Sequence, residues 1–168
     1  LYIGGNFTHV GPPTGGGVAI DAGTGSVQQP YPKVIGTVFV VAADGSGGWY
    51  LGGLFSSVRG QARNNLAQID ASGSLTAWNP NANATVRALT VSGGTVYVGG
   101  EFTQIGGQGR NRIAAVDGSN GTPDAWNPNS NNIVESFAVS GDTVYVAGSF
   151  TSIGGQARNR IAALSASS

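Results

Sequence analysis

VYVGGEFTQIGGQGRNRIAAVD, residues 96–117, is the stretch that decides the fold. An aromatic, strand-like segment opens it, a phenylalanine and a glycine-rich loop follow, and a short apolar segment closes it. The same order recurs along the chain, with tyrosines spaced by 48, 47 and 48 residues at Tyr2, Tyr50, Tyr97 and Tyr145. A fixed period of this length is typical of a protein built from one repeated structural unit.

Each unit predicts four short strands. Its apolar closing segment is followed by a turn that begins with aspartate, and then by TAWNP (76–80) or DAWNP (124–128). Because Asn-Pro ends strand pairing, this segment is predicted as the last strand of its unit. The next apolar segment, 86–91 or 133–139, leads through a tight Ser-Gly turn into the next tyrosine strand, which is a hairpin signal.

This spacing indicates an all-β protein. Four strands per unit without a 3.6-residue period predict antiparallel sheets and exclude a helical repeat. A leucine-rich or hexapeptide solenoid would repeat over shorter lengths, so the unit fits one blade of a β-propeller. We therefore expect a single partial propeller over residues 1–168, with about 3.5 blades of four antiparallel strands and units that start near Leu1, Trp49, Val96 and Val144.

The strand pattern starts and stops within a blade. A propeller has to close, because open blades leave apolar faces and strand edges exposed. We therefore expect the chain to be a portion of a longer one, or to complete its ring with another chain. Self-association or another protein partner follows from this expectation.

The composition excludes several classes of partner. Eight basic side chains balance eight acidic ones, and charged residues make up 10% of the chain, so no basic surface is expected for nucleic acid or an anionic membrane. No apolar run approaches the roughly 20 residues that span a bilayer, so membrane insertion is not expected. The chain has no cysteine, which excludes disulfides, thiolate zinc sites and a cysteine nucleophile.

The repeat also resembles a known family. VYVGGxFTxIGGQxRNRIAA, followed about a dozen residues later by WNPN, is similar to the repeat of the delta-60-type propellers, and it is matched best over residues 96–115 and 144–163. These relatives include large secreted or surface-anchored bacterial proteins, and a similar propeller occurs in fungal cortical polarity-marker proteins. The resemblance implies an exported location and a scaffold or recognition role, with no catalytic residues to carry over.

Few residues could carry catalysis or hold a metal. A Ser/His/Asp triad would need His9, the one histidine, which lies in the most degenerate copy. Asp21, Asp70 and Asp117 recur at one turn position, which indicates turn capping by the side chain. The oxygen-rich loops that start at Asp21 and Asp117 lack the further carboxylates of an EF-hand. We expect no catalytic residue, no metal and no cofactor.

An Arg-Asn pair recurs in the loop between the second and third strands of successive blades, on the face that also carries the Trp-Asn-Pro-Asn connections. Guanidinium forks there could hold carboxylates or acidic sugars. Alternatively, the arginines brace the blades through backbone carbonyls or through Trp78 and Trp126. The candidate ligand-binding residues are Arg63, Asn64, Arg110, Asn111, Arg158 and Asn159.

Two further expectations concern single residues. Arg87 and Glu135 occupy equivalent inner-strand positions in adjacent copies, so we expect their charged groups to pair. Three Asn-x-Thr acceptor sequences make glycosylation possible at Asn6, Asn83 and Asn120.

Three classes of function remain open. The leading hypothesis is a non-enzymatic, extracellular or cell-surface structural or adhesive module that assembles with other copies. The alternative is a glycan- or peptide-binding module that uses the Arg/Asn loop face, and a hydrolase ranks third. Residues that recur in every blade mainly stabilise the propeller fold. A specific activity is therefore expected where the copies differ: His9, Pro12-Pro13, Tyr31 to Lys33, Glu101 and Glu135.

Overall fold

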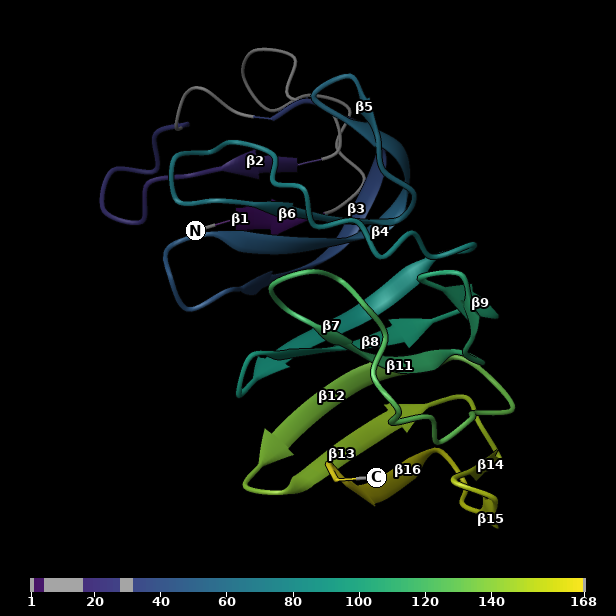
Figure 1. Ribbon diagram of the computed structural model, residues 1–168. Coiled ribbons are helices and arrows are strands. Elements are labelled where there is room, and N and C mark those ends of the chain that lie inside the picture. Colours follow the sequence, from purple (N-terminus) through teal and green to yellow (C-terminus); the bar gives the residue numbers. More distant parts are fainter. Residues whose placement is uncertain (1, 5–16, 28–31, 168) are drawn as a thin grey trace.

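The computed structural model describes residues 2–4, 17–27 and 32–167. Among these residues the protein is all-β, and its strands form antiparallel sheets that follow one another along the molecule (Figure 1). The prediction of about 3.5 propeller blades is confirmed. Asn6, His9, Pro12, Pro13 and Tyr31 lie outside the described residues.

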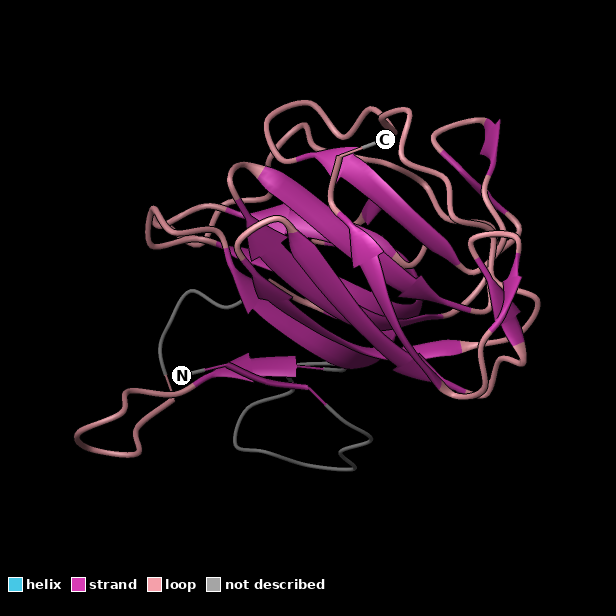
Figure 2. Cartoon of the chain, turned by 90° about the horizontal axis from the view of Figure 1, so that it is seen from below, coloured by secondary structure: helices cyan, strands magenta, loops and turns pink. Residues whose placement is uncertain are grey.

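Three blades are described at full length, and each has three strands in antiparallel register. The first partial blade contributes only the pair β1 (Tyr2–Gly4) and β2 (Gly17–Ala19). Viewed at right angles to the first figure, the blades are strongly twisted sheets (Figure 2). Blade A comprises β3 (Val34–Ala43), β4 (Trp49–Val58) and β6 (Leu66–Ile69), blade B comprises β7 (Val86–Ser92), β8 (Thr95–Gly100) and β11 (Ile113–Asp117), and blade C comprises β12 (Val134–Ser140), β13 (Thr143–Gly148) and β16 (Ile161–Ser165).

The loop between the second and third strands of each blade is held by a short ribbon. In blade A the ribbon is β5 (Gln61–Ala62) paired with the end of β4. In blades B and C it is a separate two-stranded sheet. These sheets are β9 (Gln104–Ile105) with β10 (Gln108–Gly109), and β14 (Ser152–Ile153) with β15 (Gln156–Ala157).

The first two strands of blade B form the hairpin that the Ser-Gly-Gly signal predicts. Ser92 pairs with Thr95, and the two residues between them, Gly93 and Gly94, have φ angles of 57° and 81°. Positive φ at both central positions is the geometry whose twist matches the flanking strands, and glycine adopts it without steric cost.

The residue just before each TAWNP or DAWNP segment joins its blade through an isolated β-bridge rather than a regular ladder. Leu75 bridges to Ile69 in blade A, and Pro123 bridges to Val116 in blade B. Proline has no amide hydrogen to donate, so a ladder cannot continue through these segments. The expected fourth strand is therefore reduced to one bridge, and the chain passes on to the next blade.

The hydrophobic core lies between successive blades. Side chains alternate along each strand, so Val96 and Val98 of β8 pack in the cluster with blade A, whereas Tyr97 packs in the cluster with blade C. Two tryptophans extend these clusters: the Trp78 ring lies 4.8 Å from that of Tyr50, and the Trp126 ring lies 5.3 Å from that of Tyr97, measured between centroids. Each blade is thus stabilised by its neighbours, as expected of repeat architectures.

The inner strands carry a β-bulge at the same position in every full blade, and the bulge residues are Phe39, Arg87 and Glu135. The predicted pairing of Arg87 with Glu135 is wrong. The Arg87 Nε donates to Glu101 Oε1 at 2.7 Å, across the hairpin of its own blade, and the guanidinium lies over the Phe39 ring of blade A at 5.5 Å. Arg87 therefore leans toward blade A, while Glu135 accepts a hydrogen bond from its own cross-strand neighbour Ser149.

Candidate functional site

The arginines of the Arg/Asn loops bind the backbone of their own blades. The Nη2 of Arg63 donates to the Thr76 carbonyl at 2.7 Å and its Nη1 donates to the Ala62 carbonyl at 2.9 Å. In blade B, Arg110 makes the equivalent bond to the Asp124 carbonyl at 2.7 Å. Each guanidinium thereby ties the loop to the segment that leads to the next blade.

The last of the three arginines makes a different backbone contact. Arg158 of blade C donates to the Ile153 carbonyl at 3.0 Å, within the β14–β15 ribbon. All three arginines therefore donate to backbone carbonyl oxygens, as the bracing alternative expects, but the described acceptors lie in their own blades or in the connection that follows, not in a neighbouring blade. Arg63 is also only 9% exposed, which leaves little of its side chain for a ligand.

The asparagines of these loops lie beside the Trp-Asn-Pro-Asn connections, as the strand order predicts. The Asn64 amide donates to Asn81 Oδ1 at 2.8 Å, and the Asn111 amide donates to Asn129 Oδ1 at 3.0 Å. Each Arg/Asn pair, including Arg158-Asn159, lies in the loop of its own blade. Ligand binding by these six residues stays a prediction, because their described contacts are all within the protein.

Two of the possible glycosylation sites differ in how their side chains are held. The Asn83 carbonyl oxygen accepts from the backbone amides of Thr103 and Gln104, and its amide nitrogen donates to the Thr103 hydroxyl at 3.0 Å. Asn131 makes the same three hydrogen bonds one blade later, to Thr151 and Ser152. Asn83 therefore occupies a recurring structural position. Asn120 is exposed at the turn after β11, and glycosylation stays a prediction for all three asparagines.

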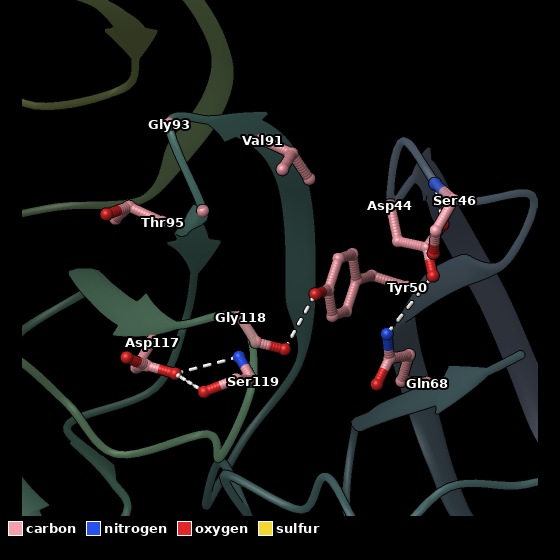
Figure 3. A pocket seen from close by; sticks show the side chains of 11 residues that line it. Asp44, Ser46, Tyr50, Gln68, Val91, Gly93, Thr95, Asp117, Gly118 and Ser119 are labelled. Atoms are coloured by element: carbon pink, nitrogen blue, oxygen red, sulfur yellow. Dashed lines mark hydrogen bonds between the residues drawn. The ribbon is translucent and has the colours of Figure 1, made fainter.

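A polar pocket of about 480 Å³ lies between blades A and B, at the end of the sheets opposite the Arg/Asn loops. Figure 3 shows the residues that line it. The Tyr50 side chain lies between its two halves, and its hydroxyl donates to the Gly118 carbonyl at 2.8 Å. Asp44 and Gln68 line one side and Asp117 lines the other. The pocket is therefore formed by turns of two different blades.

Hydrogen bonds lower the pKa of both carboxylates in this pocket. Partial burial pushes the pKa of Asp44 upward, but hydrogen bonds from Ser46, Gly48 and Gln68 outweigh burial and lower it. The hydroxyl and amide of Ser119 lower the pKa of Asp117. A glycosidase acid would need a raised pKa, so this arrangement suits hydroxyl donors or a positive charge instead.

The recurrent turn aspartates act as the sequence predicts. Asp21 accepts from the amides of Gly23 and Thr24, and Asp70 accepts from those of Ser72 and Ser74. Among the described residues, no group of three or more histidine, cysteine, aspartate or glutamate side chains could hold a metal ion. The part of the chain that the structure describes also has no helix that is long and apolar enough to cross a membrane.

The second candidate surface is the outer face of blade C, which we call the open face. Tyr145 and Ile161 on this face are 45% and 68% exposed, whereas the equivalent residues of blade B, Tyr97 and Ile113, are 5% and 0% exposed. The difference arises because blade C covers blade B and no described element covers blade C. Large exposed apolar side chains grouped on one sheet face are typical of an interaction surface.

Sequence reasoning missed the pocket, and it expected exposed apolar blade faces without naming the residues on them. It noted Tyr145 as a repeat position and Asp117 as a turn residue, and it did not single out Asp44 or Gln68. A usable signal was present for the pocket, because the turn after the first strand of a blade and the turn after its third strand lie at the same end of the sheet. The open face could be found by asking which repeat residues face away from the neighbouring described blade.

Comparison with known proteins agrees with this architecture. No curated protein matches the chain. A family model described as a β-propeller domain of unknown function, DUF5122, matches residues 41–75, 94–125 and 142–166. Each matched segment runs from the first hairpin of a blade through its third strand or just beyond, and together the segments cover more than half of the chain. The chain therefore belongs to the DUF5122 β-propeller family.

Proposed function

We propose that this chain is a non-enzymatic structural or adhesive module that acts outside the cell or on the cell surface. In this proposal it works by packing the open face of blade C against another blade of the same repeat. The propeller then serves as a scaffold that is extended by protein partners.

One observation carries the proposal: equivalent residues are buried or exposed according to whether a described blade covers them. Ile113 is fully buried under blade C, and Ile161, at the same position one blade later, is 68% exposed. Burying a side chain of this size contributes about 1.5 to 3 kcal/mol, so the open face offers a strong hydrophobic gain to a partner of matching shape.

A blade is the partner whose shape matches this face. The same face of blade A is covered by blade B, and that of blade B by blade C, through clusters of similar composition. In these two interfaces the face is covered by a valine of the inner strand, Val86 or Val134, and by a tryptophan from the segment between the blades, Trp78 or Trp126. A glycan would bury far less apolar surface on the same residues.

The location outside the cell is supported by the resemblance of the repeat to delta-60-type propellers of secreted and surface-anchored proteins. Adding protease to intact cells tests this part of the proposal, because a protein outside the cell or on its surface is degraded. Protection of the whole population from external protease would contradict the proposal.

The assembly part can be tested by adding one blade. A chain of residues 1–165 followed by a second copy of residues 71–117 carries one further Trp-Asn-Pro connection and one further blade. We expect the ring of Tyr145 to be nitrated at least tenfold more slowly in this extended chain than in the original chain, because the added blade covers it.

The matched control carries Ile161→Glu in the same extended chain. A buried, unpaired carboxylate opposes docking, so nitration of Tyr145 should return to the rate of the original chain. Equal nitration rates in the original and extended chains would contradict the proposal.

A further inference from the structure

The interfaces between blades depend on a glycine in the second strand. Gly52 and Gly99 are equivalent, and both lie on the face that the next blade covers. A Cβ at Gly99 would lie 2.6 Å from Val134 Cγ1 and 2.9 Å from Phe137 Cε2. A Cβ at Gly52 would lie 2.7 Å from Val86 Cγ1. Contacts this short require side chains of the next blade to shift, so glycine permits the close approach.

Blade C departs from this rule. Ala147 occupies the position of Gly52 and Gly99, since it pairs with Ile161 as Gly99 pairs with Ile113. Side chains alternate along β13, and the preceding Val146 is buried against blade B, so the methyl group of Ala147 points to the open face. The open face therefore carries a methyl group at the position where the two internal interfaces have none.

The methyl group of Ala147 would clash with a blade that has valine at the position of Val86 and Val134, as both internal interfaces have. Val86 and Val134, the inner-strand residues that reach the glycine, are equivalent positions in blades B and C. A blade that carried valine there could not reach the same depth on blade C without displacing side chains. Overpacking of this kind typically weakens an interface by about 1 to 3 kcal/mol.

Resting on the proposed function, we infer that Ala147 selects the partner of the open face. The partner is a blade of the same repeat with alanine, serine or glycine, rather than valine, at the position of Val86 and Val134. The smaller side chain leaves room for the Ala147 methyl group and restores the close approach of the two sheets. Blades like B and C bind this face more weakly.

The extended chain described above tests this inference, since its added blade carries a copy of Val86. Four proteins form a double-mutant cycle: Ala147 or Ala147→Gly in blade C, each combined with valine or alanine at the copied position 86. The readout is the protection of Tyr145 from nitration, relative to the matching chain without the added blade. This reference removes any effect of glycine on blade C itself.

We expect Ala147→Gly to raise the protection of Tyr145 about tenfold when the added blade carries valine. Replacing that valine by alanine should raise the protection to a similar degree when Ala147 is present. Both changes together should give less than the product of the two effects, because either change alone removes the same clash.

Two results overturn the inference without affecting the proposed function. One is unchanged protection on Ala147→Gly. The other is lower protection when the added valine becomes alanine on the Ala147 background, which would mean that the valine fills space rather than clashes. Absence of protection in all four proteins would instead contradict the proposed function.

Discussion

The indole nitrogen of Trp78 donates a hydrogen bond to the carbonyl oxygen of Asp117 at 2.9 Å, linking the connection after blade A to the end of blade B. Trp126 repeats the bond one blade later, to Ser165 at 2.7 Å. Both indoles are almost fully buried and pack against the tyrosine of the preceding blade. One side chain thus joins three elements by packing and hydrogen bonding.

This geometry predicts the effect of Trp78→Phe. The ring contact with Tyr50 is largely kept, but the Asp117 carbonyl loses its donor, so we expect the free energy of unfolding to fall by about 1 to 3 kcal/mol. Urea unfolding measures the change, and Trp126→Phe should give a similar value. A loss below 0.5 kcal/mol in both variants would contradict a stabilising role for the indole hydrogen bonds.

Arg63→Ala and Arg110→Ala test the bracing role of the loop arginines. Each substitution removes donors from two carbonyl groups, and we expect thermal unfolding at a lower temperature for both variants. The loss should be larger for Arg63, because its side chain is buried and that of Arg110 is more accessible. Lysine at either position should restore only part of the stability, because it lacks the planar fork.

A glycan-binding role predicts the opposite pattern for the same variants. If Arg110→Ala left the melting temperature unchanged but abolished retention on a cell-wall glycan column, the bracing interpretation would be wrong. Asn111→Ala serves as the matched variant, since it removes a contact to Asn129 without touching the carbonyls.

Backbone conformation predicts a stabilising substitution at Arg112. Arg112 and Arg160 have φ angles of 63° and 64°, and at the equivalent position of blade A Asn65 has a φ of 65°. Asparagine tolerates this left-handed conformation better than arginine, and Asn65 also bonds the Phe55 amide and the Ala82 carbonyl. We expect Arg112→Asn to raise the free energy of unfolding by about 1 kcal/mol.

Asn65→Arg is the reciprocal control for this prediction. It introduces the less favourable residue and removes two buried hydrogen bonds, so it should destabilise the protein. A destabilising Arg112→Asn would show that the Arg112 side chain contributes more than its backbone strain costs.

The pKa directions predict opposite pH effects for two aspartates. Asp44 has a lowered pKa in the folded protein, so its contribution to stability is complete above the pKa of the unfolded chain and is lost as the pH falls through the folded value. Burial raises the pKa of Asp124, although the Trp126 amide and Arg110 oppose it, so ionisation of Asp124 lowers stability as the pH rises above 3.8.

Urea unfolding between pH 2.5 and 6, a range chosen to bracket the ordinary aspartate pKa of about 3.9, measures both effects. Asp44→Asn should flatten the loss of stability toward low pH, and Asp124→Asn should make stability rise more steeply toward pH 6. Identical pH profiles for the two variants would contradict these assignments.

Several features of this protein were determined by sequence alone. The tyrosine period and the four short strand segments of each unit determined the blades, because segments this short without a 3.6-residue period form strands rather than helices. Gly93-Gly94 determined a hairpin turn, and the recurrent Asp21, Asp70 and Asp117 determined capped turns. These features depend on interactions between residues close together in the chain.

The tertiary structure decided which distant residues meet. Arg87 pairs with Glu101 rather than Glu135 because the guanidinium leans over Phe39 of blade A. Asp44 and Asp117 line one pocket because turns of two blades lie side by side. Ala147 matters because its methyl group faces the open side of blade C, at a position where glycine lets the internal blades approach. Repetition describes one blade well, but the contacts between blades depend on small differences among the copies, and only their packing shows which differences count.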